Sequence, residues 1–245
     1  MIYGQQPPRS AIVSASRSPP PSLNLTSFGP PRLTRGRELA AGAPEFEGLS
    51  PCPWCPRNWS FTLEVLLSQA ADPRYERLHM ATHAEFMPGG PSQARIFTGT
   101  ASVSHQEFAR LRQQRSGRPL ALFVLSACRT ALGDSDSELG FAGLALQAGS
   151  RRAIGTLWYV DDVDTSAYFL QLYRYLDQGV QKADALRATR QAMATGKVRL
   201  QGDKVIGFDG VPLLTDLTPS QRRRVASGMA HPYFWAGVQL IGTPW

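Results

Sequence analysis

The stretch PLALFVLSACRT, residues 119–130, places a cysteine directly after a continuous apolar run. A run of this kind, rich in Leu, Val and Phe, is typical of a strand buried on both faces of a parallel sheet. Cys128 would then stand where that strand ends. A cysteine in this position is either a small packed side chain or a nucleophile presented at the edge of the sheet.

Further apolar runs alternate with helical patterns, which predicts an α/β fold with a mainly parallel sheet flanked by helices. The other expected strands lie in RLHMATHAEF (77–86), where the strand should end near His83, in RAIGTLWYV (152–160) and in YFWAGVQLIG (233–242). The expected helices are FTLEVLLSQA (61–70), VSHQEFARLR (103–112), ELGFAGLALQAGS (138–150), DTSAYFLQLYRYLDQG (164–179) and KADALRATRQAMATG (182–196). Asp164 is the candidate N-cap of the fourth helix, and VRLQGDKVIGF (198–208) is expected to form a hairpin or a loose insertion.

The first part of the chain differs from the rest in composition. Residues 1–37 contain no acidic side chain and include stretches such as SPPPS (18–22) that interrupt regular structure. We therefore expect residues 1–45 to form a disordered basic tail and residues 46–245 to form the folded domain. Only AIVSA (11–15) reads as a strand in this region, so the sheet is expected to lack its first strand and helix.

Composition and charge also exclude several classes of protein. The net charge of +7 invites a nucleic-acid partner, but no aromatic side chains are interleaved with the basic ones, so we expect no specific nucleic-acid binding. No apolar run approaches the roughly 18 residues of a membrane span, and three cysteines do not make a disulfide framework. These features predict a cytoplasmic protein that does not enter the membrane.

Two chemically active residues follow predicted neighbouring strands. His83 comes after the run RLHMA, and Cys128 comes 45 residues later, after LFVLSA. Because reactive groups collect at the carboxyl ends of parallel strands, the two side chains are expected at one edge of the sheet. A histidine there could generate the thiolate that is the competent nucleophile.

Four blocks in this order, LHMATHAEF, LFVLSACRTALGD, ELGFAGLALQAGSRRAIGTLWYVDD and HPYFWAGVQLIG, resemble a CHAT domain. That caspase-like family is often joined to tetratricopeptide repeats, and the chain is closest in style to its cyanobacterial members. The resemblance implies a caspase-like fold and a cysteine endopeptidase that needs no metal or cofactor. It also implies a protein substrate and a tetratricopeptide-repeat or other regulatory protein as partner.

The resemblance places the catalytic pair on His83 and Cys128, with the backbone N–H groups of Cys128 and Ala84 holding the oxyanion. Family members often have glycine where this chain has Ala84. In LWYVDDVDT (157–165), similarity to the separase peptidases makes Asp162 a candidate for binding a basic substrate side chain, and Glu85 could also line the cleft. The alternative is that Asp164 caps a helix while its acidic neighbours are solvated.

Other motifs are expected to be structural. CPWC (52–55) has no second ligand pair for zinc and no suitable context for redox chemistry. His79 is expected to be a packed or an edge histidine of its strand, His105 to begin a helix, and His231 to lie in the turn before the last strand. Two functions remain open at this stage: an active cysteine endopeptidase, or a non-catalytic CHAT module acting in protein–protein interaction.

Overall fold

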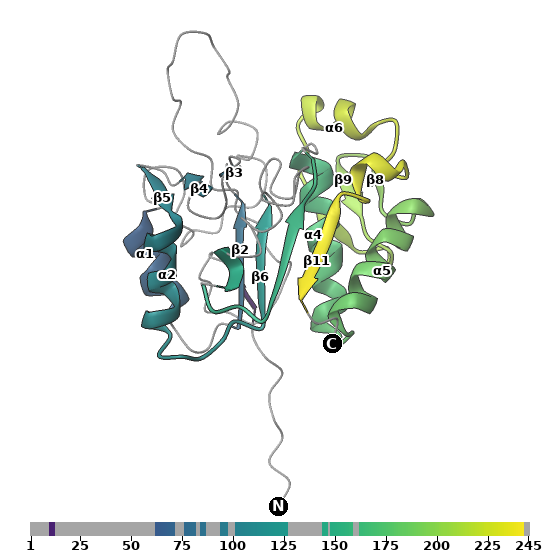
Figure 1. The fold of residues 1–245 in the computed structure, drawn as a ribbon. Helices are drawn as coiled ribbons and strands as arrows, with labels where there is room; N and C mark the ends of the chain where they lie inside the picture. Colours follow the sequence, from purple (N-terminus) through teal and green to yellow (C-terminus); the bar gives the residue numbers. More distant parts are fainter. Residues whose placement is uncertain are drawn as a thin grey trace, which may run out of the picture.

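A five-stranded sheet forms the centre of the protein (Figure 1). The computed structural model describes residues 10–12, 62–71, 76–81, 84–86, 94–97, 101–126, 144–146, 148–158 and 162–242. The strands of this sheet, in spatial order, are β1 (Ser10–Ile12), β2 (Arg77–Ala81), β6 (Leu122–Ser126), β7 (Arg152–Thr156) and β11 (Val238–Gly242). The first four run parallel and β11 runs antiparallel to β7, which confirms the predicted α/β class with a mainly parallel sheet.

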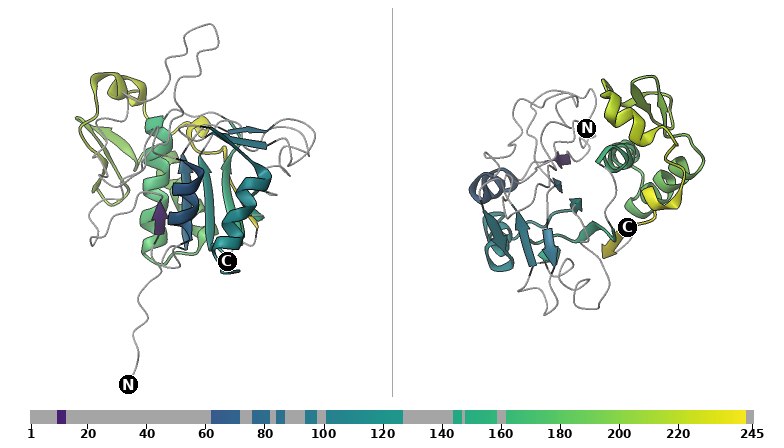
Figure 2. Two further views of the ribbon diagram at one scale, coloured as in Figure 1. Left: turned by 90° about the vertical axis from the view of Figure 1, so that its left-hand side faces the viewer. Right: turned by 90° about the horizontal axis from the view of Figure 1, so that it is seen from above.

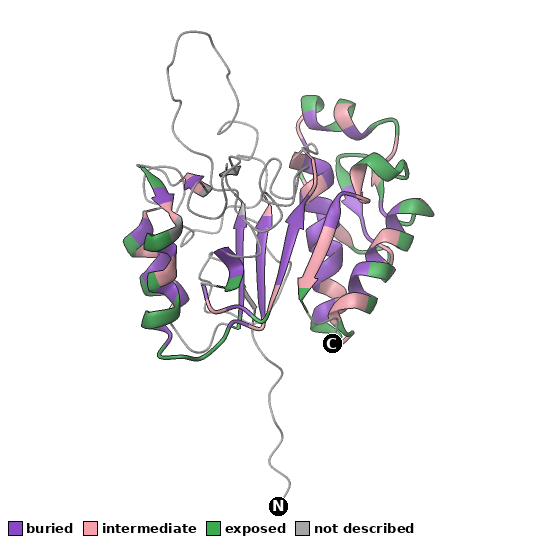
Figure 3. Cartoon of the chain, viewed as in Figure 1, coloured by how far each residue is buried: buried purple, intermediate pink, exposed green. Residues whose placement is uncertain are grey.

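Helices cover both faces of this sheet (Figure 2). The helices α1 (Leu63–Ala70) and α2 (His105–Gln114) lie on one face, and α4 (Asp162–Asp177) and α5 (Lys182–Ala194) lie on the other. Successive residues of a strand point to opposite faces. Because helices cover both faces of the sheet, the residues of β6 that enter the two cores are all apolar. Phe123 and Leu125 belong to the core with α1 and α2, while Leu122 and Val124 belong to the core with α4 and α5. Figure 3 shows β6 and β7 buried over most of their length, whereas β11 is mostly of intermediate burial.

The sheet has an opening strand. In β1, Ser10, Ala11 and Ile12 pair in parallel with Arg77, Leu78 and His79 of β2. This strand begins one residue before the AIVSA stretch that the sequence offers, and α1 lies between β1 and β2 along the chain. The expectation that the first strand and helix are missing is therefore not met. The remainder of the predicted tail lies outside the described residues.

Two small antiparallel sheets accompany the central one. The first has strands β3 (Ala84–Phe86), β4 (Ala94–Phe97) and β5 (Ser102–Ser104), and it was not predicted. The second has strands β8 (Arg199–Gln201), β9 (Lys204–Ile206) and β10 (Pro212–Leu214). Its β8–β9 pairing confirms the predicted hairpin. The short helix α6 (Pro219–Val225) and the 3-10 turn Pro232–Phe234 lead into β11.

Several predicted boundaries were wrong, two of them next to the candidate site. The fourth helix begins at Asp162 rather than after an N-cap at Asp164, and the last strand begins at Val238 rather than Tyr233. In the second case, Pro232 starts a 3-10 turn that is capped by the side chain of His231, which accepts a hydrogen bond from the Tyr233 N–H. No helix in the described ranges is long and apolar enough to cross a membrane.

His79 ties the sheet to α4. It is 2% exposed, its Nδ1 is hydrogen-bonded to the Tyr173 hydroxyl at 2.9 Å, and its ring packs edge-on against Phe169 with centroids 4.7 Å apart. Burial lowers the pKa of His79 to about 3, because the charged imidazolium would lose its hydration there. The predicted packed histidine is confirmed, and the ring is neutral at ordinary pH.

A neutral buried histidine makes stability depend on pH. The unfolded chain takes up a proton near pH 6.5 and the folded chain does so only near pH 3, so stability is complete above pH 6.5 and falls as the pH drops toward 3. Each pH unit in that window costs about 1.4 kcal/mol through this one group. The variant His79→Asn, whose amide lies near the Nδ1 position but does not titrate, is expected to flatten that slope in urea unfolding at pH 7.5 and 5. A slope equal to that of the wild type would contradict this role.

The β9–β10 connection docks on α4 through polar contacts. The Arg174 guanidinium donates to the Asp209 carboxylate at 2.8 Å and to the Val211 carbonyl at 2.9 Å. The Gln171 amide oxygen accepts from the Phe208 N–H at 3.0 Å. Gly207 lies between these groups, and a Cβ there would come within 2.7 Å of Arg174 Nη1.

The substitution Gly207→Ala should therefore push the connection away from α4 and cost about 1–3 kcal/mol of unfolding free energy, the usual range for an overpacked site. Urea unfolding would measure this cost. In an Arg174→Ala variant the guanidinium that obstructs the added methyl is absent. Gly207→Ala should therefore lower the unfolding free energy less in that variant than in the wild type. An equal cost in both backgrounds would mean that Arg174 is not what excludes the side chain.

Candidate active site

The strands that precede His83 and Cys128 are neighbours and end side by side. β2 pairs with β6 in parallel, and their last residues, Ala81 and Ser126, are partners in register. His83 and Cys128 each follow their strand end by two positions along the chain. Both residues lie outside the described part of the structure, so this register is what the structure contributes to their placement.

A third strand ends at the same edge. β7 pairs with β6 so that Val124 is opposite Ile154, and the same register brings Thr156 level with Ser126. The carboxyl ends of β2, β6 and β7 thus form one continuous edge. In a parallel sheet this is the edge at which loops carry reactive groups.

Ala84 and Glu85 begin a strand close to this edge. β3 starts three residues after β2 ends, and Ala84 is 7% exposed and lies opposite Ile96 of β4. Glu85 is opposite Arg95 in the same ladder, a position that suits an ion pair across the two strands. The side chain of Glu85 lies outside the described residues. The pairing of β3 with β4 therefore fixes the backbone at Ala84. A fixed backbone N–H is what an oxyanion site requires.

Asp162 and Asp164 occupy the first turn of α4, which begins six residues after β7 ends. Asp162 is half-buried, whereas Asp164 is 1% exposed. Carboxylates in the first turn of a helix interact favourably with its dipole. The alternative in which Asp164 is the N-cap is wrong, because the helix has already begun. Asp161 lies outside the described residues.

An aromatic pair stands beyond the end of β7, and sequence reasoning missed it. The Trp158 indole N–H donates to the Tyr233 carbonyl at 2.8 Å, and the two rings stack with centroids 6.2 Å apart. Gly237 lets the indole approach closely, since a Cβ there would come within 2.8 Å of the ring. Tyr233 is 47% exposed despite its size. The signal in the sequence was the excess of aromatic residues just before the last strand.

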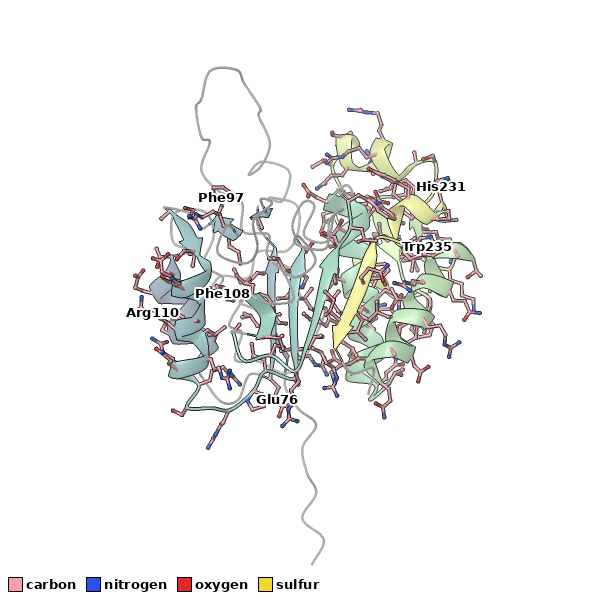
Figure 4. All side chains as sticks on the ribbon, in the orientation of Figure 1. Glu76, Phe97, Phe108, Arg110, His231 and Trp235 are labelled. Carbon is pink, nitrogen blue, oxygen red and sulfur yellow. The ribbon has the colours of Figure 1, made fainter. Side chains whose placement is uncertain are left out.

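The remaining candidates have structural roles. His79 is buried and neutral, as described above, and His105 begins α2 as predicted. His231 caps the 3-10 turn next to Trp235, as Figure 4 shows. The CPWC stretch lies outside the described residues. Within the described ranges, no group of three or more His, Cys, Asp or Glu side chains is placed to hold a metal ion.

The geometry agrees with a comparison against protein families. The CHAT domain family matches residues 54–243, a span that includes β2, β6, β7 and β11. No curated protein matches the chain significantly. A match over more than half of the sequence, together with the observed sheet, establishes the relationship, and the chain belongs to the CHAT domain family of caspase-like domains.

Proposed function

We propose that this CHAT domain is a cysteine endopeptidase with a catalytic pair formed by His83 and Cys128. The observation that supports it best is the register between Ala81 and Ser126. Parallel strands lie about 4.8 Å apart, so two residues that follow aligned strand ends begin from backbones within reach of one another. Histidine and cysteine at that separation are the residue types that nucleophilic cleavage of a peptide bond requires.

In the proposed reaction, the Cys128 thiolate attacks the carbonyl carbon of the scissile bond. His83 takes the thiol proton and passes it to the leaving amine, which leaves an acyl-enzyme. Water then attacks the thioester carbonyl, His83 accepts its proton, and the carboxylic acid is released with Cys128 regenerated. The N–H groups of Cys128 and Ala84 are proposed to stabilise the oxyanion that forms twice in this sequence.

A non-catalytic module is the alternative. Its main support in the sequence was the missing opening strand, and β1 removes that support. The reactivity of Cys128 then decides between the two functions.

Labelling with an iodoacetamide probe across pH tests the catalytic pair. Near pH 6.5 an unperturbed thiol with a pKa of about 8.5 is about 1% thiolate, so Cys128 should label about tenfold faster than Cys52 and Cys55 in the same protein. The His83→Ala variant should lose this advantage, while His105→Ala should keep it. If Cys128 reacts only after denaturation, it is a packed core residue and the peptidase proposal fails.

We further propose that Asp162 binds a basic side chain of the residue before the scissile bond. Its place at the start of α4 and its partial burial support this role, because a half-buried carboxylate interacts more strongly with a cation than an exposed one. Glu85, at the other end of the site, is the second candidate.

With peptides that carry Arg before the scissile bond, Asp162→Asn should lower kcat/KM by about ten- to a hundredfold, as loss of a charge-assisted hydrogen bond predicts. Peptides with Leu at that position should be cleaved as before. The variants Glu85→Gln and Asp203→Asn, the latter on the exposed β8–β9 turn, are compared in parallel. An equal loss for Arg and Leu peptides would mean that Asp162 acts on the fold of the site rather than on specificity.

A further inference from the structure

The edge of the sheet opposite the candidate active site carries unbalanced positive charge. In residues 108–126 and 144–158 there are six arginines and no acidic side chain. These segments include the C-terminal end of α2 and the segments that lead into β6 and β7. Figure 3 shows exposed residues running from the end of α2 toward the start of β6.

Four of these arginines, Arg110, Arg112, Arg118 and Arg151, are exposed. We call the last three, which lie closest to the segments that enter β6 and β7, the arginine edge. They gather around the bridge between Leu120 and Ser150. The Arg151 N–H donates to the Leu120 carbonyl at 2.9 Å, and Arg112 Cγ lies 3.1 Å from where a Cβ on Gly149 would be. None of the three forms an ion pair with a carboxylate in the described part of the chain.

The scaffold under these side chains is fixed. Arg115 is 4% exposed, donates to the Ala70 carbonyl at the end of α1, and donates through Nε to the Arg118 carbonyl at 3.1 Å. The turn that carries Arg118 has two residues with positive φ, Ser116 at 50° and Gly117 at 77°, which fix its tight path. The guanidinium groups therefore extend from a rigid backbone, which lowers the entropy lost when a ligand binds.

An exposed apolar side chain adjoins the arginine edge. Leu146 is 63% exposed, and its carbonyl accepts the N–H of Gly149 at 3.0 Å, so it belongs to the same turn that Arg112 contacts. No aromatic residue is exposed in the described residues of this surface, so bases would find nothing to stack on. Arginine beside leucine suits a partner that offers both carboxylates and aliphatic side chains.

We propose that the arginine edge, together with Leu146, binds an acidic polypeptide segment that contains aliphatic residues, on a partner protein. The surface lies at the amino ends of β6 and β7, away from the edge where a substrate would be cleaved. The proposal is thus independent of the catalytic pair: a partner could remain bound here while the opposite edge is free. Glu76 lies at the same edge, as Figure 4 shows, and its exposed carboxylate weakens the positive field.

The test measures fluorescence anisotropy of a labelled peptide rich in Glu and Leu, with the full chain at about 0.1 M salt, where surface charges still interact over about 10 Å. The triple variant Arg112→Glu, Arg118→Glu and Arg151→Glu should bind at least about tenfold more weakly than the wild type, since each exposed pair contributes a few-fold. A matched triple variant, Arg222→Glu, Arg223→Glu and Lys204→Glu, changes the same charge at exposed positions on α6 and β9 and should bind within about twofold of the wild type.

Two further comparisons identify the partner class. Leu146→Ser, and separately a peptide with Ser in place of Leu, should each weaken binding several-fold, and Glu76→Gln should strengthen it.

Equal loss in the two triple variants would overturn the proposal, because the effect would then be one of net charge alone. Tighter binding of a single-stranded oligonucleotide of equal charge, unaffected by Leu146→Ser, would also overturn it and assign the edge to nucleic acid. If the triple variant does not fold, the single Arg→Gln variants are measured instead and should each lose part of the affinity.

Discussion

The parallel register between β2 and β6 is the constraint on which the rest of the structure depends. It aligns Ala81 with Ser126, and through β7 it extends to Thr156, so three strands end together. A shift of one residue would invert every side chain of β6 between the two cores, moving Phe123 and Leu125 from one helix layer to the other. Burial on both faces therefore fixes where the chain beyond each strand begins.

The second constraint is the attachment of α4, whose second half is held by polar contacts. Tyr173 bonds His79 in the sheet, Asp177 pairs with Arg77 at 2.8 Å, and Arg174 holds the β9–β10 connection. These contacts lie in the second half of the helix and leave its first turn at the carboxyl edge of the sheet. The same rigid helix thus anchors in the core at one end and presents Asp162 and Asp164 at the other. Acidic side chains placed on such an element keep their position when a substrate binds, which a loop would not ensure.

Much of this arrangement could be predicted from the sequence, because buried parallel strands are written as continuous apolar runs. The runs around Leu78, Phe123 and Ile154 each became a strand, and the histidine and cysteine that follow two of them fall beyond aligned strand ends. The sheet of β3, β4 and β5 was not predicted because its strands have only three or four residues. Strands this short do not produce a recognisable alternation of apolar and polar residues. The start of α4 was misplaced because Asp161, Asp162 and Asp164 are all of a residue type that favours a helix start, so the local pattern does not fix the first helical residue. The Trp158–Tyr233 pair joins residues 75 apart, which no local pattern reveals.

The two edges of the sheet differ in their chemistry, and the difference has a structural origin. At the carboxyl edge, the first turn of α4 contributes acidic side chains, and Trp158 and Tyr233 contribute aromatic ones. At the amino edge, the segments entering β6 and β7 contain arginines and no carboxylate. The strands between them are mostly buried, so charge placed at one edge is separated from the other by a largely apolar layer about five residues thick, roughly 16 Å. The exposed charges at the two edges interact through the solvent around the sheet, where this separation exceeds the screening length of about 8 Å in physiological salt. A protein bound at the arginine edge would therefore leave the electrostatics of the candidate active site unchanged, so any influence it has on that site must pass through the positions of the strands.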